Sequence, residues 1–360
     1  MTIQFKSILF CILSITFIVS CESNSSMQFG TESEVLKTLI DETSLNTINL
    51  DQIPITDISL GPENIIQQDS VDADLLLTSP TNTFAKGERV YITDLRQPTV
   101  LIADTSNTII DAIGRKGRGP GEFESVSAIF SSEEHIFIAD GSLSRVNQYE
   151  YDTFNYIKSF NIYVGLDDLA ASNNYIFAST RSGAKNLTQV YNNAEPYAEY
   201  DSLLPRLIPM GKEPSGYNTF QIDATNGVTM AAYPGFPYLF LFDDNLNLTS
   251  TIQFTADSFS DIDNPEAIPV DNIGRMEGAV RRYITDFKLS ESGHLYAIID
   301  NTLTIIDTNN NYEVEGRYDI RDRTKGNESI SMSFISQSDG RVYLNSISHP
   351  AIYVFDRQEH

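Results

Sequence analysis

Short runs of β-branched and aromatic residues recur along the chain from about residue 70 to its end, with turn residues between them. The runs return at intervals of about 40 to 50 residues. Such a pattern predicts strand hairpins, because these side chains pack well on a pleated sheet and Gly, Asn and Asp favour turns. Six runs mark the repeat: Val90–Asp94, Ile136–Asp140, Tyr175–Ser179, Val228–Ala232, Leu295–Ile299 and Val342–Ser346.

A second β-rich run follows most of the first ones after a turn. These second runs are Thr99–Ala103, Arg145–Tyr149, Tyr238–Phe242, Leu303–Asp307 and Ala351–Asp356. Helical periodicity is almost absent, apart from one short helix predicted over Ser33–Ile40. We interpret two wider gaps in the repeat, 183–216 and 257–278, as loop insertions. The pattern predicts an all-β chain that forms a six-bladed β-propeller.

The last repeat ends at Asp356 after three predicted strands, so its blade lacks an outer strand. A β-prone segment, Thr47–Leu60, precedes the first blade and is free to supply it. We predict that this N-terminal segment pairs as the outer strand of the last blade. Closing the ring in this way removes the exposed edges that an open sheet would offer to other chains.

The first 21 residues have the pattern of a secretory signal. Lys6 precedes an apolar run from Ile8 to Val19, and the run stops at Ser20 and Cys21. A run of this length is too short to cross a hydrocarbon core of about 30 Å as a helix. The junction resembles the lipobox of bacterial lipoproteins, which implies that residues 1–20 are removed and that Cys21 is lipidated. The alternative is an ordinary cleaved signal in which the cysteine is incidental.

The predicted signal gives the chain a location and an organisation. We expect an outer-membrane lipoprotein of the cell envelope that faces either the periplasm or the outside. Residues 21–45 then form a tether with the short helix, and 46–360 form the propeller. The acyl chains are its only contact with the membrane. With Cys11 removed and Cys21 acylated, no disulfide is expected.

Composition narrows the range of partners. The chain has 49 Asp and Glu against 24 Lys and Arg, a formal net charge of −25. Such acidity repels phosphate backbones and anionic headgroups, so nucleic acid is not an expected partner. We expect a monomer that binds an envelope protein, a peptide or a glycan.

A Gly-rich segment, Gly114–Phe123, links the first two blades. It resembles the turn of NHL repeats, and in the following unit Asp140 and Arg145 stand at the Asp and Arg positions of such a repeat. Over about residues 70 to 356 the chain resembles the six-bladed β-propeller lipoproteins of Bacteroidota with NHL-like repeats. The resemblance implies a fold and a location rather than a reaction. It also implies that Asp140 and Arg145 pair.

Much of the scarce positive charge maps to one face of the predicted disc. Loops between the second and third strands of a blade emerge on the same side as the links between blades, and ligands of propellers usually bind there. We predict that this rim binds an anionic glycan or the carboxylate of a peptide. Its candidate residues are Arg96, Arg115, Arg118, Arg281, Arg282, Tyr283 and His349. The alternative is that these arginines pair with carboxylates of their own or neighbouring blades.

Catalytic chemistry has little support in the sequence. Of four histidines, His135 and His294 occupy the hairpin-turn positions held by arginines in two other repeats, on the face opposite the rim. No catalytic residue and no resident cofactor or metal are predicted, although Asp, Glu and Asn are numerous enough for an oxygen-ligated cation such as Ca²⁺. Function is therefore predicted as a binding or scaffolding module rather than an enzyme.

Two alternatives come from other classes of protein. One is a metal-dependent hydrolase or lyase, similar to gluconolactonase-like propellers, with its site in the channel mouth. Three or more acidic or Asn side chains around one point would favour it. The other is a structural subunit of a cell-surface assembly, which a large exposed apolar patch on one face would favour.

Overall fold

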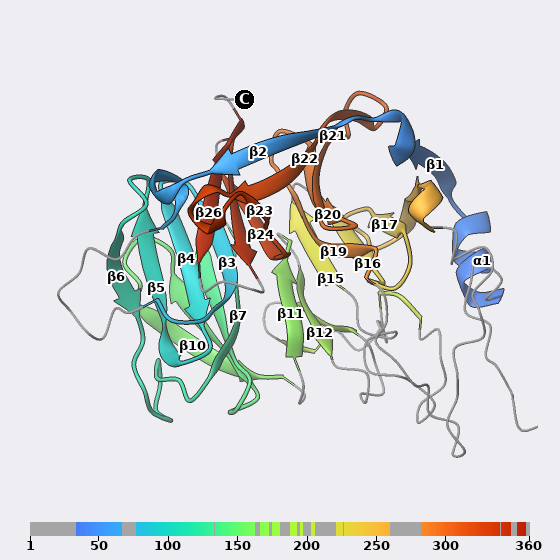
Figure 1. Ribbon diagram of the computed structural model, residues 1–360. Helices are drawn as coiled ribbons and strands as arrows, with labels where there is room; N and C mark the ends of the chain where they lie inside the picture. Colours follow the sequence, from blue (N-terminus) through green and yellow to red (C-terminus); the bar gives the residue numbers. More distant parts are fainter. Residues whose placement is uncertain are drawn as a thin grey trace, which may run out of the picture.

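The computed structural model describes residues 34–66, 77–132, 134–162, 166–172, 175–180, 188–192, 195–196, 203–205, 221–225, 227–259, 282–338, 340–346 and 351–357. Their strands form six sheets arranged as the blades of a propeller (Figure 1). Within each blade, consecutive strands pair antiparallel in sequence order. The predicted all-β, six-bladed fold is confirmed.

The first three blades have four strands each. Blade 1 contains β3 (Pro80–Lys86), β4 (Arg89–Asp94), β5 (Gln97–Asp104) and β6 (Ile109–Ile113). Blade 2 contains β7 (Val126–Ser131), β8 (His135–Asp140), β9 (Arg145–Glu150) and β10 (Tyr156–Asn161). Blade 3 contains β11 (Leu166–Ala171), β12 (Tyr175–Thr180), β13 (Thr188–Asn192) and β14 (Glu195–Pro196).

The last three blades differ in size. Blade 4 contains β15 (Gln221–Thr225), β16 (Val228–Ala232), β17 (Tyr238–Phe242) and β18 (Leu248–Thr255). Blade 5 contains β19 (Ile284–Leu289), β20 (His294–Ile299), β21 (Thr302–Asp307) and β22 (Glu313–Asp322), with the short β23 (Glu328–Ser329) on β22. Blade 6 contains β24 (Met332–Ser338), β25 (Arg341–Ser346) and β26 (Ile352–Asp356). The six sequence runs that marked the repeat are the second strands of the blades.

The middle strands explain why the repeat was readable in the sequence. In β4, β8, β20 and β25 every residue after the first is buried, because neighbouring blades cover both faces of the sheet. Such strands have continuous apolar runs instead of alternation. The outer strand β10 is almost entirely exposed. Burial therefore decreases from the middle of the blade to its outer edge.

The hydrophobic core lies between blades. One cluster joins blades 5 and 6 around Leu303 and Leu344, a second joins blades 6 and 1, and a third joins blades 1 and 2 around Phe123. The innermost strands contact one another around the ring, including β24 with β3. The ring is thus held by packing between blades.

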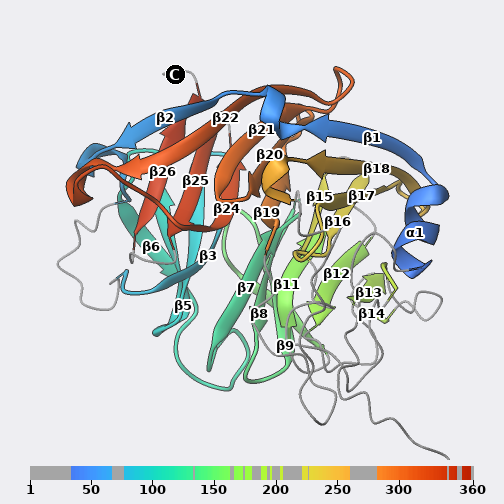
Figure 2. The ribbon, with the colours of Figure 1, turned by 45° about the vertical axis from the view of Figure 1, so that its right-hand side comes forward.

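The N-terminal segment wraps the outside of blades 4 and 5. Helix α1 (Glu34–Asp41) confirms the predicted helix and leads into β1 (Ser44–Asn49), which pairs parallel with β18. After a 3-10 turn, η1 (Leu50–Gln52), β2 (Ile55–Leu60) pairs parallel with β22. Figures 1 and 2 show this segment running from α1 past β18 and along β22 toward β26. We call β1, η1 and β2 the belt.

The belt corrects one prediction about ring closure. Residues 47–60 add fifth strands to blades 4 and 5 rather than a fourth strand to blade 6, because their apolar faces bury Ile48 and Ile58 against those blades. The backbone of the N-terminal segment pairs with blade 6 only after the 3-10 turn η2 (Pro62–Asn64). There Ile65 bridges Tyr353 antiparallel and the Ile66 amide donates to the Ile352 carbonyl at 3.0 Å.

Other parts of the sequence predictions fall outside the described residues. These include the signal, Cys21 and most of both predicted insertions. In the part of the chain that the structure describes, no helix combines the length and hydropathy needed to cross a membrane.

Candidate functional site

The inner strands of blades 3, 4 and 5 each carry one buried aspartate: Asp168, Asp223 and Asp286. The inner edge of a propeller blade has backbone amides without a strand partner, and buried amides need an acceptor. Each carboxylate accepts an amide from the inner strand of the next blade. The three donors are Ile222 at 3.2 Å, Leu289 at 2.8 Å and Ile335 at 2.8 Å, respectively.

Lys288 points into the same cluster from β19. Its Nζ lies 3.5 Å from Asp223 Oδ1, and both side chains are largely buried. Burial alone lowers the pKa of an ammonium, but the nearby carboxylates outweigh it and raise the pKa of Lys288 above its usual value. The side chain is therefore charged. Three carboxylates do converge here, but they converge on an ammonium.

The carboxylates themselves cannot all ionise freely. Burial, opposed by Lys288 and reinforced by Asp168, raises the pKa of Asp286 to about 7. Burial likewise raises the pKa of Asp168. Three acids facing one ammonium leave an excess of negative charge, so a proton near neutral pH is held within the cluster.

A cavity of about 820 Å³ opens beside this cluster, where the first hairpins of all six blades meet. Serine and threonine hydroxyls line it from several blades, together with the rings of Phe84, Phe130 and Tyr151. Its cationic side chains are Lys86, Lys288 and Arg357, with His294 beside them, and its acidic ones are Asp223 and Glu291. The volume lies within the range of about 300–1,000 Å³ typical of small-ligand sites.

Lys86 is held at the wall of this cavity by two neighbours. Its Nζ donates to the Ser132 carbonyl and lies 4.8 Å from the ring centroid of Tyr151. The Tyr151 hydroxyl donates back to the Lys86 carbonyl at 3.0 Å. These contacts hold the positive charge of Lys86 at the cavity wall.

The described arginines among the predicted rim residues do not line this cavity. Arg115 forms an ion pair with Glu122 at 2.8 Å, and the Gly119 amide and Arg115 together lower the pKa of that carboxyl. Arg118 lies 3.3 Å from Glu124. Both arginines remain exposed on the Gly-rich link. Within the described chain, none of the predicted rim residues lines the cavity where the first hairpins meet, which we call the hairpin-side cavity.

The remaining rim candidates are spread over the fold. Arg96 and Arg282 are exposed, whereas Tyr283 is buried with its ring 4.9 Å from that of Phe259. Arg281 and His349 lie outside the described residues. The anion site at the rim therefore stays a prediction.

The Asp140–Arg145 pair is corrected. The two residues face each other across β8 and β9, but each binds backbone. Asp140 accepts amides that include those of Glu124 and Leu143. The Arg145 guanidinium donates to three carbonyls of the Gly-rich link, which lack strand partners: those of Arg118, Gly119 and Glu122.

The sequence predictions missed the cluster of Asp168, Asp223, Asp286 and Lys288, which we call the central cluster, and the cavity beside it. A signal for the cluster existed, because aspartate is depleted in strands and yet occurs in the apolar segments just before the second strands of three consecutive blades. The cavity had no local signal, since its wall comes from all six repeats.

Comparison with known proteins agrees with the architecture. No curated protein matches the chain. A solved structure described as an exported protein of Bacteroides fragilis matches with a TM-score of 0.54 at 12% identity, covering 84% of this chain and 88% of that one. Hydrazine synthase of Kuenenia stuttgartiensis matches with a TM-score of 0.47 at 10% identity, covering 77% and 95%. The likeness to the Bacteroides fragilis structure concerns the fold alone.

A family match covers most of the propeller. Residues 72–315 match the DUF5128 family, described as a 6-bladed beta-propeller. The matched range begins before blade 1 and ends within blade 5. The chain belongs to this family of six-bladed β-propellers.

Proposed function

We propose that this protein is an exported binding module that holds an anionic glycan or peptide in the hairpin-side cavity. The observation that carries the proposal is the combination of about 820 Å³ of space with cations, hydroxyls and aromatic rings in one wall. Ligand sites typically combine such apolar surface with a few oriented polar groups.

The wall chemistry favours a ligand with both hydroxyl and carboxylate groups. The rings of Phe84 and Tyr151 offer flat apolar surface, and the serine hydroxyls both donate and accept hydrogen bonds. Lys86 places a positive charge at the same wall. Lys288 contributes less to ligand binding, because Asp223 already neutralises it.

The proposed location is the outer membrane, through an acylated Cys21. It is supported by the lipobox-like junction of Ser20 and Cys21 and by the likeness to a structure described as an exported protein.

Titration calorimetry tests the proposal with trigalacturonate as the anionic probe and maltotriose as the neutral one. We expect the wild type to bind trigalacturonate preferentially, and binding to weaken as salt shortens the screening length below about 10 Å. Lys86→Gln should weaken binding, since it removes the charge and keeps a donor near Ser132. Arg115→Gln is the matched control on the link.

Two results would contradict the proposal. Equal binding of both probes would show that the cavity does not select anions. Loss of binding in Arg115→Gln, with Lys86→Gln unaffected, would assign the site to the rim predicted from the sequence.

A further inference from the structure

Several blades carry a basic residue, Arg or His, at the start of the second strand, opposite an acidic residue at the end of the third. The pairs are Arg89 with Asp104, His135 with Glu150, His294 with Asp307, and Arg341 with Asp356. In blade 6 the pair is an ion pair of 3.4 Å. Histidine replaces arginine in blades 2 and 5, and only the imidazole can act as a metal ligand.

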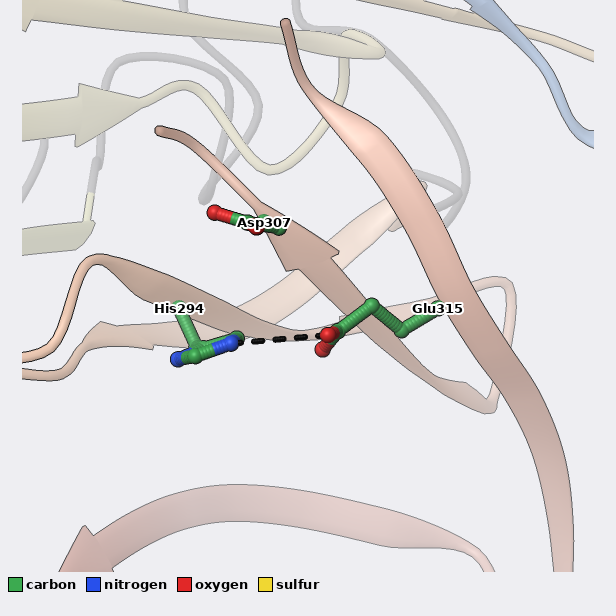
Figure 3. Close-up of side chains that lie close together, drawn as sticks. All are labelled: His294, Asp307 and Glu315. Atoms are coloured by element: carbon green, nitrogen blue, oxygen red, sulfur yellow. Dashed lines mark ion pairs between the residues drawn. The ribbon is translucent and has the colours of Figure 1, made fainter. Parts of the chain in front are cut away.

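Blade 5 adds a third group to its histidine pair. The ladder between β21 and β22 shifts register between Ile305 and Ile306, whose partners are Gly316 and Val314. Glu315 is thus the extra residue of a β-bulge, a feature that re-aims a side chain. Figure 3 shows Glu315 facing His294, with Asp307 on the strand between them.

We propose that His294, Asp307 and Glu315 bind a divalent first-row metal ion, with Zn²⁺ the best fit. One ligand atom from each residue lies within 4.8 Å of the other two. His294 Nε2 and Glu315 Oε1 are 3.5 Å apart, and two ligands of one tetrahedral zinc ion are separated by about 3.4 Å. One nitrogen and two carboxylate donors suit zinc better than calcium, which takes oxygen ligands.

Each candidate ligand already has a partner that orients it. Ser292 Oγ lies 2.9 Å from His294 Nδ1, so a proton on Nδ1 leaves Nε2 as the ligand atom. Arg357 binds Glu315 through Oε2 at 2.6 Å, while Oε1 faces the histidine. Asp307 Oδ1 accepts a hydrogen bond from the Asn309 amide at 2.9 Å, which leaves Oδ2 as the ligand atom. Such outer partners are typical of metal sites.

The competing explanation is a plain ion-pair network in which protonated His294 joins Glu315 and Arg357. Blade 2 separates the two explanations. His135 has the same strand position and faces Glu150, but it belongs to no group of three ligating side chains among the described residues. His135→Gln is therefore the matched control. The inference does not depend on a ligand in the hairpin-side cavity, although His294 lines that cavity.

The test uses the full chain without a histidine tag, freed of metal with EDTA and titrated with Zn²⁺ by calorimetry. We expect one zinc ion to bind to wild type and to His135→Gln with equal affinity. His294→Gln and Glu315→Gln should each weaken this binding by about tenfold or more. Co²⁺ bound to the wild type should give visible d–d absorption without a thiolate band.

The proposal is overturned if the wild type binds no zinc, or if His294→Gln and Glu315→Gln bind it as well as the wild type does. Far-ultraviolet circular dichroism shows whether each variant is folded. Should one of these two variants not fold, the other still decides. In the wild type, intense tetrahedral d–d absorption distinguishes bound Co²⁺ from the weakly absorbing hexaaqua ion.

Discussion

If the belt is part of the propeller core rather than a tether, a small change in β2 must destabilise the whole domain. Leu60 is 1% exposed and packs into the cluster between blades 5 and 6, with Tyr353 and Phe355 among its members. Truncating a fully buried leucine typically costs about 2–5 kcal/mol, because transfer energy is lost and a cavity remains. Typical stabilities are only about 5–15 kcal/mol. We therefore expect Leu60→Ala to remove a large part of the stability.

Ile55 provides the control on the same strand. Its side chain is 51% exposed, and it pairs with the same outer strand, β22. Ile55→Ala should change the unfolding free energy by about 0.5 kcal/mol or less. Urea unfolding followed by tyrosine fluorescence measures both variants. Equal midpoints for the two would refute the reasoning and reduce the belt to a surface attachment.

Two further predictions concern the central cluster and the Gly-rich link. The pKa of Asp286 is about 7 in the folded state and about 3.9 in an unfolded chain, so the folded state binds its proton more tightly. The free energy of unfolding should therefore fall by at most about 4 kcal/mol as pH rises from about 4 to about 7. Asp286→Asn should flatten this part of the plot of thermal-unfolding midpoint against pH. A plot unchanged by the substitution would contradict the prediction. Gly114→Ala should lower the thermal-unfolding midpoint more than Gly326→Ala does. Both glycines have positive φ, but only a Cβ at Gly114 meets the ring of Phe123. Equal decreases in the midpoint would show that the Gly-rich link shifts to accommodate the added methyl group.

The blades were predictable because burial on both faces leaves a signal in five or six consecutive residues. Ile136–Asp140 is such a run, and it forms β8. The belt was assigned to the wrong blades because β-propensity locates a strand but does not name its partner. That choice depended on where Ile58 and Leu60 are buried, which only the assembled ring defines.

The candidate sites show the same limit at the level of side chains. The sequence pattern placed His294 on the hairpin face, which is where it lines the cavity. Its association with Glu315 depends on a bulge in β22, and one inserted residue has no recognisable pattern. Arg145 binds carbonyls of the link instead of Asp140, since an irregular backbone leaves acceptors that a repeat pattern does not reveal.

The belt also determines the order in which the chain can fold. Ser44 bonds to Thr249, 205 residues later, and the Leu50 carbonyl accepts from Arg317, 267 residues later. Contacts of such separation form slowly, because a long loop must close first. As the chain emerges from a ribosome or an export channel, its first two strands have no partners until blades 4 and 5 have followed. Ile48, Leu50, Ile58 and Leu60 lack their burial partners for that time, so the belt cannot fold before blades 4 and 5 and needs protection from aggregation until then.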